Sequence, residues 1–160
     1  MTAARTGDVI GATWGEIKLE AKTWTIPAER YKTGKEHVIQ LSDAAIALLT
    51  GLKSNRNADA YVFPGATGKP LSNMAMLELL RGMDANGYTP HGMRSSFSNW
   101  GHRDFDHETV ELCLGHVVGN KVSQAYWRDT VMPKCGRCWQ AWANYLGNVH
   151  AAENVVKLHG

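Results

Sequence analysis

The chain has 160 residues, a formal net charge of +2, 44% hydrophobic residues and 20% charged residues. This composition is typical of one soluble globular domain with its own core. No apolar run approaches the ~18 residues of a membrane span, and the N-terminus "MTAARTGDVI" lacks the apolar core of a secretory signal. We therefore expect a cytoplasmic protein with no membrane partner. The basic clusters "RYKTGKEH" (30–37) and "KSNR" (53–56) fit either solvated loops or a nucleic-acid surface.

The first part of the chain predicts a helix and then a small β-sheet. "AARTGDVIGA" is typical of a helix that turns Val9 and Ile10 inward. Three strand-like runs follow, separated by turns, at residues 15–19, 23–26 and 37–41. Pro27 ends the second run, because proline cannot donate a hydrogen bond to a strand ladder.

The remainder of the chain predicts helices. Ser42 or Asp43 can cap a helix with a stripe of apolar residues, and Ser72 can cap another that runs to about residue 86. The stripe comprises Ala45, Leu48, Leu49 and Leu52. Further helices are expected at 91–103, 107–115, 120–128 and 133–146, and the apolar run 154–158 fits a short strand or a frayed tail. The predicted fold class is mainly α with a small three-stranded antiparallel β-sheet near the N-terminus.

Two short motifs resemble known sites but fail on spacing. "PGATGKP" (64–70) has two residues between its glycines where a phosphate loop needs four, and a proline follows its lysine. "CGRC" (135–138) lacks the two further ligands of a zinc site, and its cysteines share a helical stripe with Trp139, Trp142 and Leu146. Both cysteines are therefore predicted to be core residues, and with Cys113 they are too few for a disulfide framework.

The helix predicted at 91 has two distinct faces. Met93, Phe97 and Trp100 lie on one face, whereas His91 and Arg94 lie on the other. A helix N-terminus with an imidazole and a guanidinium favours a bound phosphate, although a solvated helix start fits the same pattern.

Two further polar residues follow this helix. His116, in "LGHVVGN", lies off the apolar stripe of the next helix, twenty-two residues after Arg94. Tyr126 follows ten residues later. Together with His91 and Arg94, these residues can form a phosphate-binding set that includes a nucleophile.

The order and spacing of "HGMR" (91–94), "LGH" (114–116) and "AY" (125–126) resemble the catalytic domain of tyrosine recombinases, the phage integrases. "ARTGDV" resembles the first-arginine motif of that family, with Arg5 as its arginine and Asp8 as its acidic residue. "YKTGKEHVIQLS" resembles its β-hairpin lysine region. The likeness covers about residues 3–145, is strongest to integrases of prophages and genomic islands, and implies the DNA breaking-rejoining enzyme fold.

The resemblance implies a role for each motif residue. Arg5 and Arg94 would hold the non-bridging oxygens of one DNA phosphate, and Lys32 would protonate the leaving 5′ oxygen, with Lys35 as the alternative. His91 would hydrogen-bond the phosphate and help in proton transfer, and His116 would hydrogen-bond the phosphate or orient the nucleophile. Tyr126 would attack phosphorus and form a 3′-phosphotyrosyl link without a metal or cofactor. The expected DNA-contacting residues are Lys35, His37 and Lys121.

The implied function is site-specific DNA recombination and integration on double-stranded DNA, by a tetramer in full-length members. Such members carry a DNA-binding domain before this one, so we expect residues 1–160 to be a single catalytic domain, truncated at its N-terminus. Weak, salt-sensitive DNA binding should follow. The tail 147–160 is expected either to dock on a neighbouring protomer or to stay with its own chain. The alternatives are a remnant that only binds DNA or protein, a type IB topoisomerase, and a metal or redox protein built on the 135–138 cysteines.

Overall fold

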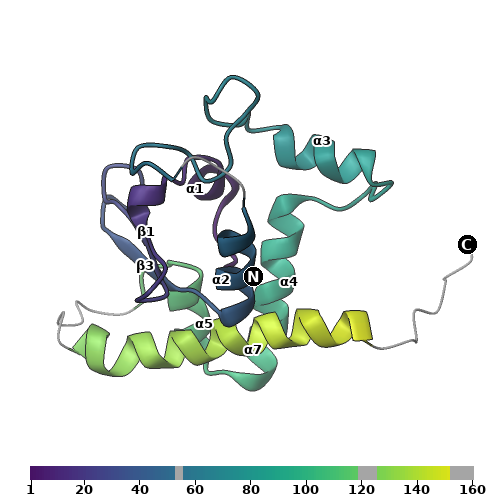
Figure 1. Ribbon diagram of the computed structural model, residues 1–160. Coiled ribbons are helices and arrows are strands. Elements are labelled where there is room, and N and C mark those ends of the chain that lie inside the picture. Colours follow the sequence, from purple (N-terminus) through teal and green to yellow (C-terminus); the bar gives the residue numbers. More distant parts are fainter. Residues whose placement is uncertain (53–55, 119–125, 152–160) are drawn as a thin grey trace, which may run out of the picture.

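A computed structural model describes residues 1–52, 56–118 and 126–151, and Figure 1 shows their arrangement. Strands β1 (Ile17–Lys18), β2 (Thr23–Ile26) and β3 (His37–Gln40) form one antiparallel sheet in that order. The helices are α1 (Thr6–Ile10), α2 (Asp43–Gly51), α3 (Ala75–Gly82), α4 (Pro90–Asp104), α5 (His107–Cys113) and α7 (Met132–Ala151). A 3₁₀ turn, η1 (Trp14–Glu16), precedes β1, and a π-helical turn, η2 (Trp127–Val131), leads into α7. The predicted fold class is confirmed.

The sheet places its apolar side chains in the core. Trp24 pairs with Ile39 across β2 and β3, and both side chains are buried, as is Ile26. β1 is shorter than predicted, because the residues before it form η1. There the N–H groups of Trp14 and Gly15 donate to the carbonyls of Ala60 and Ala58 rather than to a strand.

Helix α7 lies along one side of the molecule, with α5 and the sheet packed on it (Figure 1). Its buried stripe is made by Cys135, Cys138, Trp139 and Trp142. The Cys135 Sγ lies 3.9 Å from the Thr109 carbonyl of α5, and the Cys113 Sγ lies 3.8 Å from the Cys135 carbonyl. The prediction that the cysteines are core residues is therefore confirmed, and none of the three forms a disulfide.

Side-chain caps determine where three helices begin. The Ser42 hydroxyl accepts from the Ala45 N–H at the start of α2, and the Thr89 hydroxyl accepts from the Gly92 N–H ahead of α4. Asp106 caps α5 by accepting from the Thr109 N–H at 2.8 Å. Each cap satisfies an N–H group that has no partner within its own helix.

Several element predictions were wrong in detail. The first helix begins only at Thr6, with Arg5 in extended conformation before it. Helix α3 begins at Ala75 without a side-chain cap, because Ser72 contributes its carbonyl there and not its hydroxyl. Leu48 and Met93, which their spacing places on the apolar faces of their helices, are nevertheless 49% and 51% exposed. Most of the helix predicted at 120–128, and the run 154–158, lie outside the described residues.

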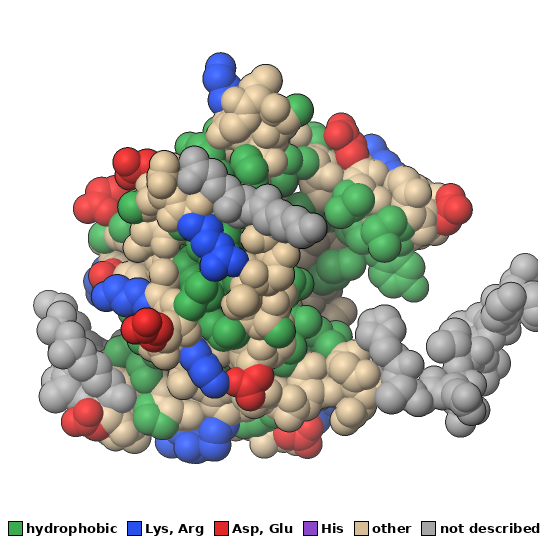
Figure 2. All heavy atoms as spheres, viewed as in Figure 1, with side chains coloured by type: hydrophobic (Ala, Val, Ile, Leu, Met, Phe, Trp, Pro, Cys, Tyr) green, Lys and Arg blue, Asp and Glu red, His purple; other side chains and the backbone are tan. Residues whose placement is uncertain are grey.

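Residues 64–70 form a turn, as predicted, in which the Gly65 N–H donates to the Lys69 carbonyl at 2.8 Å. The following helix, α3, extends away from the sheet (Figure 1), and hydrophobic side chains gather on this part of the surface in Figure 2. They belong to a set of exposed apolar residues that includes Met74, Leu79 and Met83. Among the described helices, none is both long and apolar enough to cross a membrane.

Candidate active site

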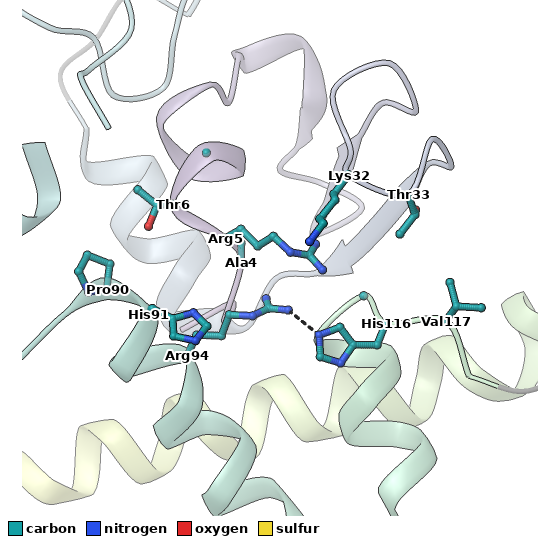
Figure 3. A pocket seen from close by; sticks show the side chains of 12 residues that line it. Ala4, Arg5, Thr6, Lys32, Thr33, Pro90, His91, Arg94, His116 and Val117 are labelled. Carbon is teal, nitrogen blue, oxygen red and sulfur yellow. Dashed lines mark hydrogen bonds between the residues drawn. The ribbon is translucent and has the colours of Figure 1, made fainter. Parts of the chain in front are cut away.

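A pocket of about 690 Å³ opens where four segments distant in sequence meet. These are the N-terminal segment with the start of α1, the β2–β3 hairpin, the start of α4 and the loop after α5. Figure 3 shows side chains from all four segments around this pocket. The lining residues are Ala4, Arg5, Thr6, Gly7, Lys32, Thr33, Pro90, His91, Arg94, Gly115, His116 and Val117. Five of the six predicted catalytic residues are among them, and no carboxylate is.

Arg94 connects two walls of this pocket. Its Nη1 donates to the Ala3 carbonyl of the N-terminal segment, and its Nη2 donates to the Leu114 carbonyl at the end of α5. The same Nη2 lies 3.5 Å from His116 Nε2, the contact drawn in Figure 3. Burial, and next the charge of Arg5, lower the pKa of Arg94, although a guanidinium remains charged throughout the physiological range.

Arg5 presents a second guanidinium from the opposite wall. Its Cζ lies 5.0 Å from the centre of the Tyr31 ring, and its Nη1 lies 3.9 Å from Asp8 Oδ2. Among the described residues, this buried Nη1 has no hydrogen-bond partner. This Nη1 is therefore held by its ion pair with the Asp8 carboxylate, while Arg5 as a whole lines the pocket.

Asp8 fixes the backbone at Arg5. Its carboxylate accepts from the Arg5 N–H at 3.3 Å, and the Arg30 side chain holds the Asp8 carbonyl at 3.0 Å while also bonding Glu16. Burial raises the pKa of Asp8, and the hydrogen bond and charge of Arg5 oppose that shift. Asp8 and Arg30 therefore position the first arginine without lining the pocket themselves.

His116 is oriented by a carboxylate outside the pocket. Its Nδ1 lies 2.6 Å from Glu111 Oε2, which leaves Nε2 on the side of Arg94. The hydrogen bond with His116 lowers the pKa of Glu111. A carboxylate on one ring nitrogen sets the tautomer and the orientation of an imidazole. Glu111 was missed in the sequence, where its only signal is a charged residue five positions before the histidine.

Gly115 holds the loop that carries His116 close to the β2–β3 hairpin. Its backbone is left-handed, with a φ of +64°, which glycine adopts without steric cost. The Tyr31 hydroxyl donates to the Gly115 carbonyl at 3.2 Å, and the Tyr31 ring stacks on His37 with centroids 4.8 Å apart. Tyr31 and His37 thus form a buried support beneath the loop.

The burial of His37 corrects the prediction that this residue contacts DNA. Its side chain is only 8% exposed and faces Tyr31, so a direct contact with DNA does not fit. Burial, followed by the charges of Arg5 and Arg94, lowers the pKa of His37 to about 4. The ring is therefore neutral at physiological pH and acts as a core aromatic group.

This burial predicts a pH-dependent stability. Between the ordinary pKa of 6.5 and about 4, the unfolded chain binds a proton at His37 that the folded chain does not. The free energy of unfolding should therefore fall by about 3 kcal/mol as pH drops through this window. Urea unfolding at several pH values should show a shallower fall for His37→Phe, which keeps the ring stack. Equal slopes for the two proteins would contradict this origin.

The remaining predicted residues occupy different places. Lys32 lines the pocket from the hairpin, whereas Lys35 is exposed and is not a lining residue. His91 lies in the first turn of α4 with Pro90 ahead of it. Tyr126 is 47% exposed just before η2 and does not line the pocket. Lys121 lies outside the described residues.

The charges of the side chains around the pocket indicate what kind of ligand the pocket suits. Two guanidiniums, one ammonium and two imidazoles surround a space that no carboxylate of the described residues lines. The N-terminus of α4, with His91 in its first turn, adds the partial positive charge of the helix dipole. The fold and the site thus define a mainly helical domain with an oxyanion pocket suited to a phosphate group.

The chain belongs to the phage integrase family, whose model matches residues 1–131. It is 30% identical over 150 residues to prophage integrase IntA of Escherichia coli, covering 91% of this chain and 36% of that protein. It is 36% identical over 121 residues to prophage integrase IntZ of the same species, covering 73% and 30%. The chain therefore spans roughly a third of the length of these relatives.

Two solved structures share the fold. The XerA recombinase superposes with a TM-score of 0.58 at 12% identity, over 95% of this chain and 54% of that one. A transposon integrase in complex with a circular intermediate DNA gives a TM-score of 0.57 at 14% identity, over 72% and 47%. Family membership and fold agree with the resemblance seen in the sequence motifs.

Proposed function

We propose that this chain carries the catalytic site of a tyrosine recombinase, which cleaves and rejoins DNA strands at specific sites through a 3′-phosphotyrosyl intermediate. The observation that carries the proposal is the convergence of Arg5, Lys32, His91, Arg94 and His116 on one pocket. Its partner would be double-stranded DNA in the cytoplasm, with self-association into a tetramer on that DNA. Membership in the integrase family supports the same reaction.

The proposed chemistry places one scissile phosphate in the pocket. Arg5 and Arg94, which both line the pocket, hold the non-bridging oxygens and stabilise the charge that develops in the transition state. The Tyr126 oxygen forms a bond to phosphorus while the bond to the 5′ oxygen breaks. Lys32 donates a proton to that leaving oxygen, and the phenol proton passes to a base, for which the pocket offers the His91 and His116 imidazoles.

The covalent link conserves the energy of the phosphodiester, so the reverse steps can rejoin a strand without ATP. The mechanism requires Tyr126 to approach the pocket that it does not line. Because catalytic groups often take their final positions only with substrate bound, we assign this step to DNA binding.

A covalent adduct tests the proposal. The chain is mixed at low salt with a labelled pool of nicked suicide duplexes of randomised sequence, and adducts are resolved on a denaturing gel. The unsubstituted chain should form an adduct that Tyr126→Phe loses. Tyr145→Phe is the matched control, because Tyr145 has a similar exposure of 42% and stacks on Trp142 through its ring. No adduct at any protein concentration would overturn the proposal in favour of a remnant that only binds DNA or protein, and an adduct retained in Tyr126→Phe would overturn the role of that tyrosine.

A further inference from the structure

A cluster of two histidines and one glutamate lies behind the pocket. His102 comes from the last turn of α4, His107 begins α5 and Glu111 follows one turn later on α5. One ligand atom from each residue lies within 4.8 Å of the other two. None of the three lines the pocket, and the proposed phosphate chemistry uses neither His102 nor His107.

The fold holds these side chains on one side of the α4–α5 corner. His107 and Glu111 are four residues apart, so they lie one above the other on the same face of α5. The Asp106 cap fixes the start of α5, and the Phe105 N–H bonds back to the Gly101 carbonyl at the end of α4. The two imidazole rings stack with centroids 5.0 Å apart and planes 17° apart, and His102 Nε2 lies 3.6 Å from Glu111 Oε1.

From this geometry we propose a binding site for a divalent transition-metal ion of the zinc or cobalt class, formed by His102, His107 and Glu111. Zinc takes imidazole nitrogens and carboxylate oxygens at about 2.0–2.2 Å. The ligand atoms lie within 4.8 Å of one another, so these side chains must rotate, and the two stacked rings must turn toward a common point, to reach that distance from one ion. Imidazole ligands favour zinc, cobalt, nickel and copper over magnesium and calcium, and three protein ligands leave a coordination position for water.

Glu111 connects the site to the pocket through His116, which lines it. Glu111 Oε2 holds His116 Nδ1 at 2.6 Å, while Oε1 faces His102. A metal on Oε1 withdraws negative charge from the carboxylate and weakens the hydrogen bond that orients His116. This coupling to His116 rests on the proposed function, whereas the binding of the metal does not.

Titration calorimetry with the untagged full chain tests the site directly, with zinc chloride and cobalt chloride as the probes. One ion per chain should bind, and His107→Ala should lower the affinity by at least about tenfold. Glu108→Gln is the matched control, because this neighbouring acidic residue on α5 is exposed and outside the cluster; its affinity should match that of the unsubstituted chain. Equal affinity in His107→Ala, or no binding at all, would overturn the proposal.

The cobalt spectrum distinguishes this site from the three buried thiols of Cys113, Cys135 and Cys138. Imidazole and carboxylate ligands should give weak visible bands alone, and a strong thiolate band in the near ultraviolet would overturn the assignment. For the coupling, zinc should slow adduct formation in the unsubstituted chain but not in His107→Ala. Equal inhibition of both proteins would refute the coupling between the metal and His116. The calorimetry needs no DNA, so it would still show whether the metal site exists.

Discussion

Replacing Arg94 with lysine should lower the rate of adduct formation by about 10²–10³-fold. The guanidinium reaches the Ala3 and Leu114 carbonyls at the same time and also contacts His116. A lysine ammonium is a point charge on a flexible stem, so it cannot reproduce this planar fork or bind two phosphate oxygens together with it. The substitution conserves the net charge, so the lower rate would be due to the geometry of the side chain.

The same substitution also removes a structural contact. Leaving the Leu114 carbonyl without its donor should cost about 1–3 kcal/mol of unfolding free energy, so urea unfolding must accompany the kinetic measurement. Arg103→Lys is the matched control, because Arg103 is exposed in the last turn of the same helix and should leave both quantities unchanged. Adduct formation within about tenfold of the unsubstituted rate in Arg94→Lys would contradict the role of the fork.

Gly115→Ala should destabilise the fold by about 2–4 kcal/mol. A Cβ at this position would lie 1.6 Å from the Tyr31 hydroxyl oxygen and 2.8 Å from its Cζ. Tyr31 is buried against His37, so it cannot move aside cheaply. Because the clash lies beside His116, activity should fall together with stability.

A second glycine distinguishes the effect of the steric clash on stability from the effect of backbone strain. Gly34 has a similar φ of +66°, but a methyl group added there would meet no atom of the described residues within 4 Å, so Gly34→Ala should lose only about 1–2 kcal/mol. Adding Tyr31→Phe to Gly115→Ala should recover part of the loss, because it removes the atom closest to the new methyl group. Equal losses for Gly34→Ala and Gly115→Ala in urea unfolding would show that strain alone is at work.

Local patterns predicted much of this domain. The cap at Ser42, the buried cysteine stripe of α7 and the three strands all follow from residue type and spacing. These features depend on hydrogen bonds and packing between residues close in sequence, and periodicity reports such contacts directly. Leu48 was misplaced because periodicity identifies an apolar face but not whether another element covers it.

The motif residues were found in the sequence, but their supports were not. Arg94 bonds a carbonyl 91 residues away, and Tyr31 bonds one 84 residues away. Glu111 belongs to no motif, Tyr31 lies in the hairpin motif without a predicted role, and His37 was assigned to DNA although it is buried. Such contacts arise only when the hairpin, the N-terminal segment and the α5 loop fold against one another.

The resemblance of the sequence motifs to those of a known family therefore indicated the family and the charged groups that the pocket presents. The tertiary structure decided which of them share one space, which lysine of the hairpin enters it and that Tyr126 does not line it. It also determined that the His37 ring is buried in the core and is therefore neutral at physiological pH. The physical reason is that burial and long-range packing set the environment of a side chain, and neither property is encoded in the neighbouring residues of the sequence.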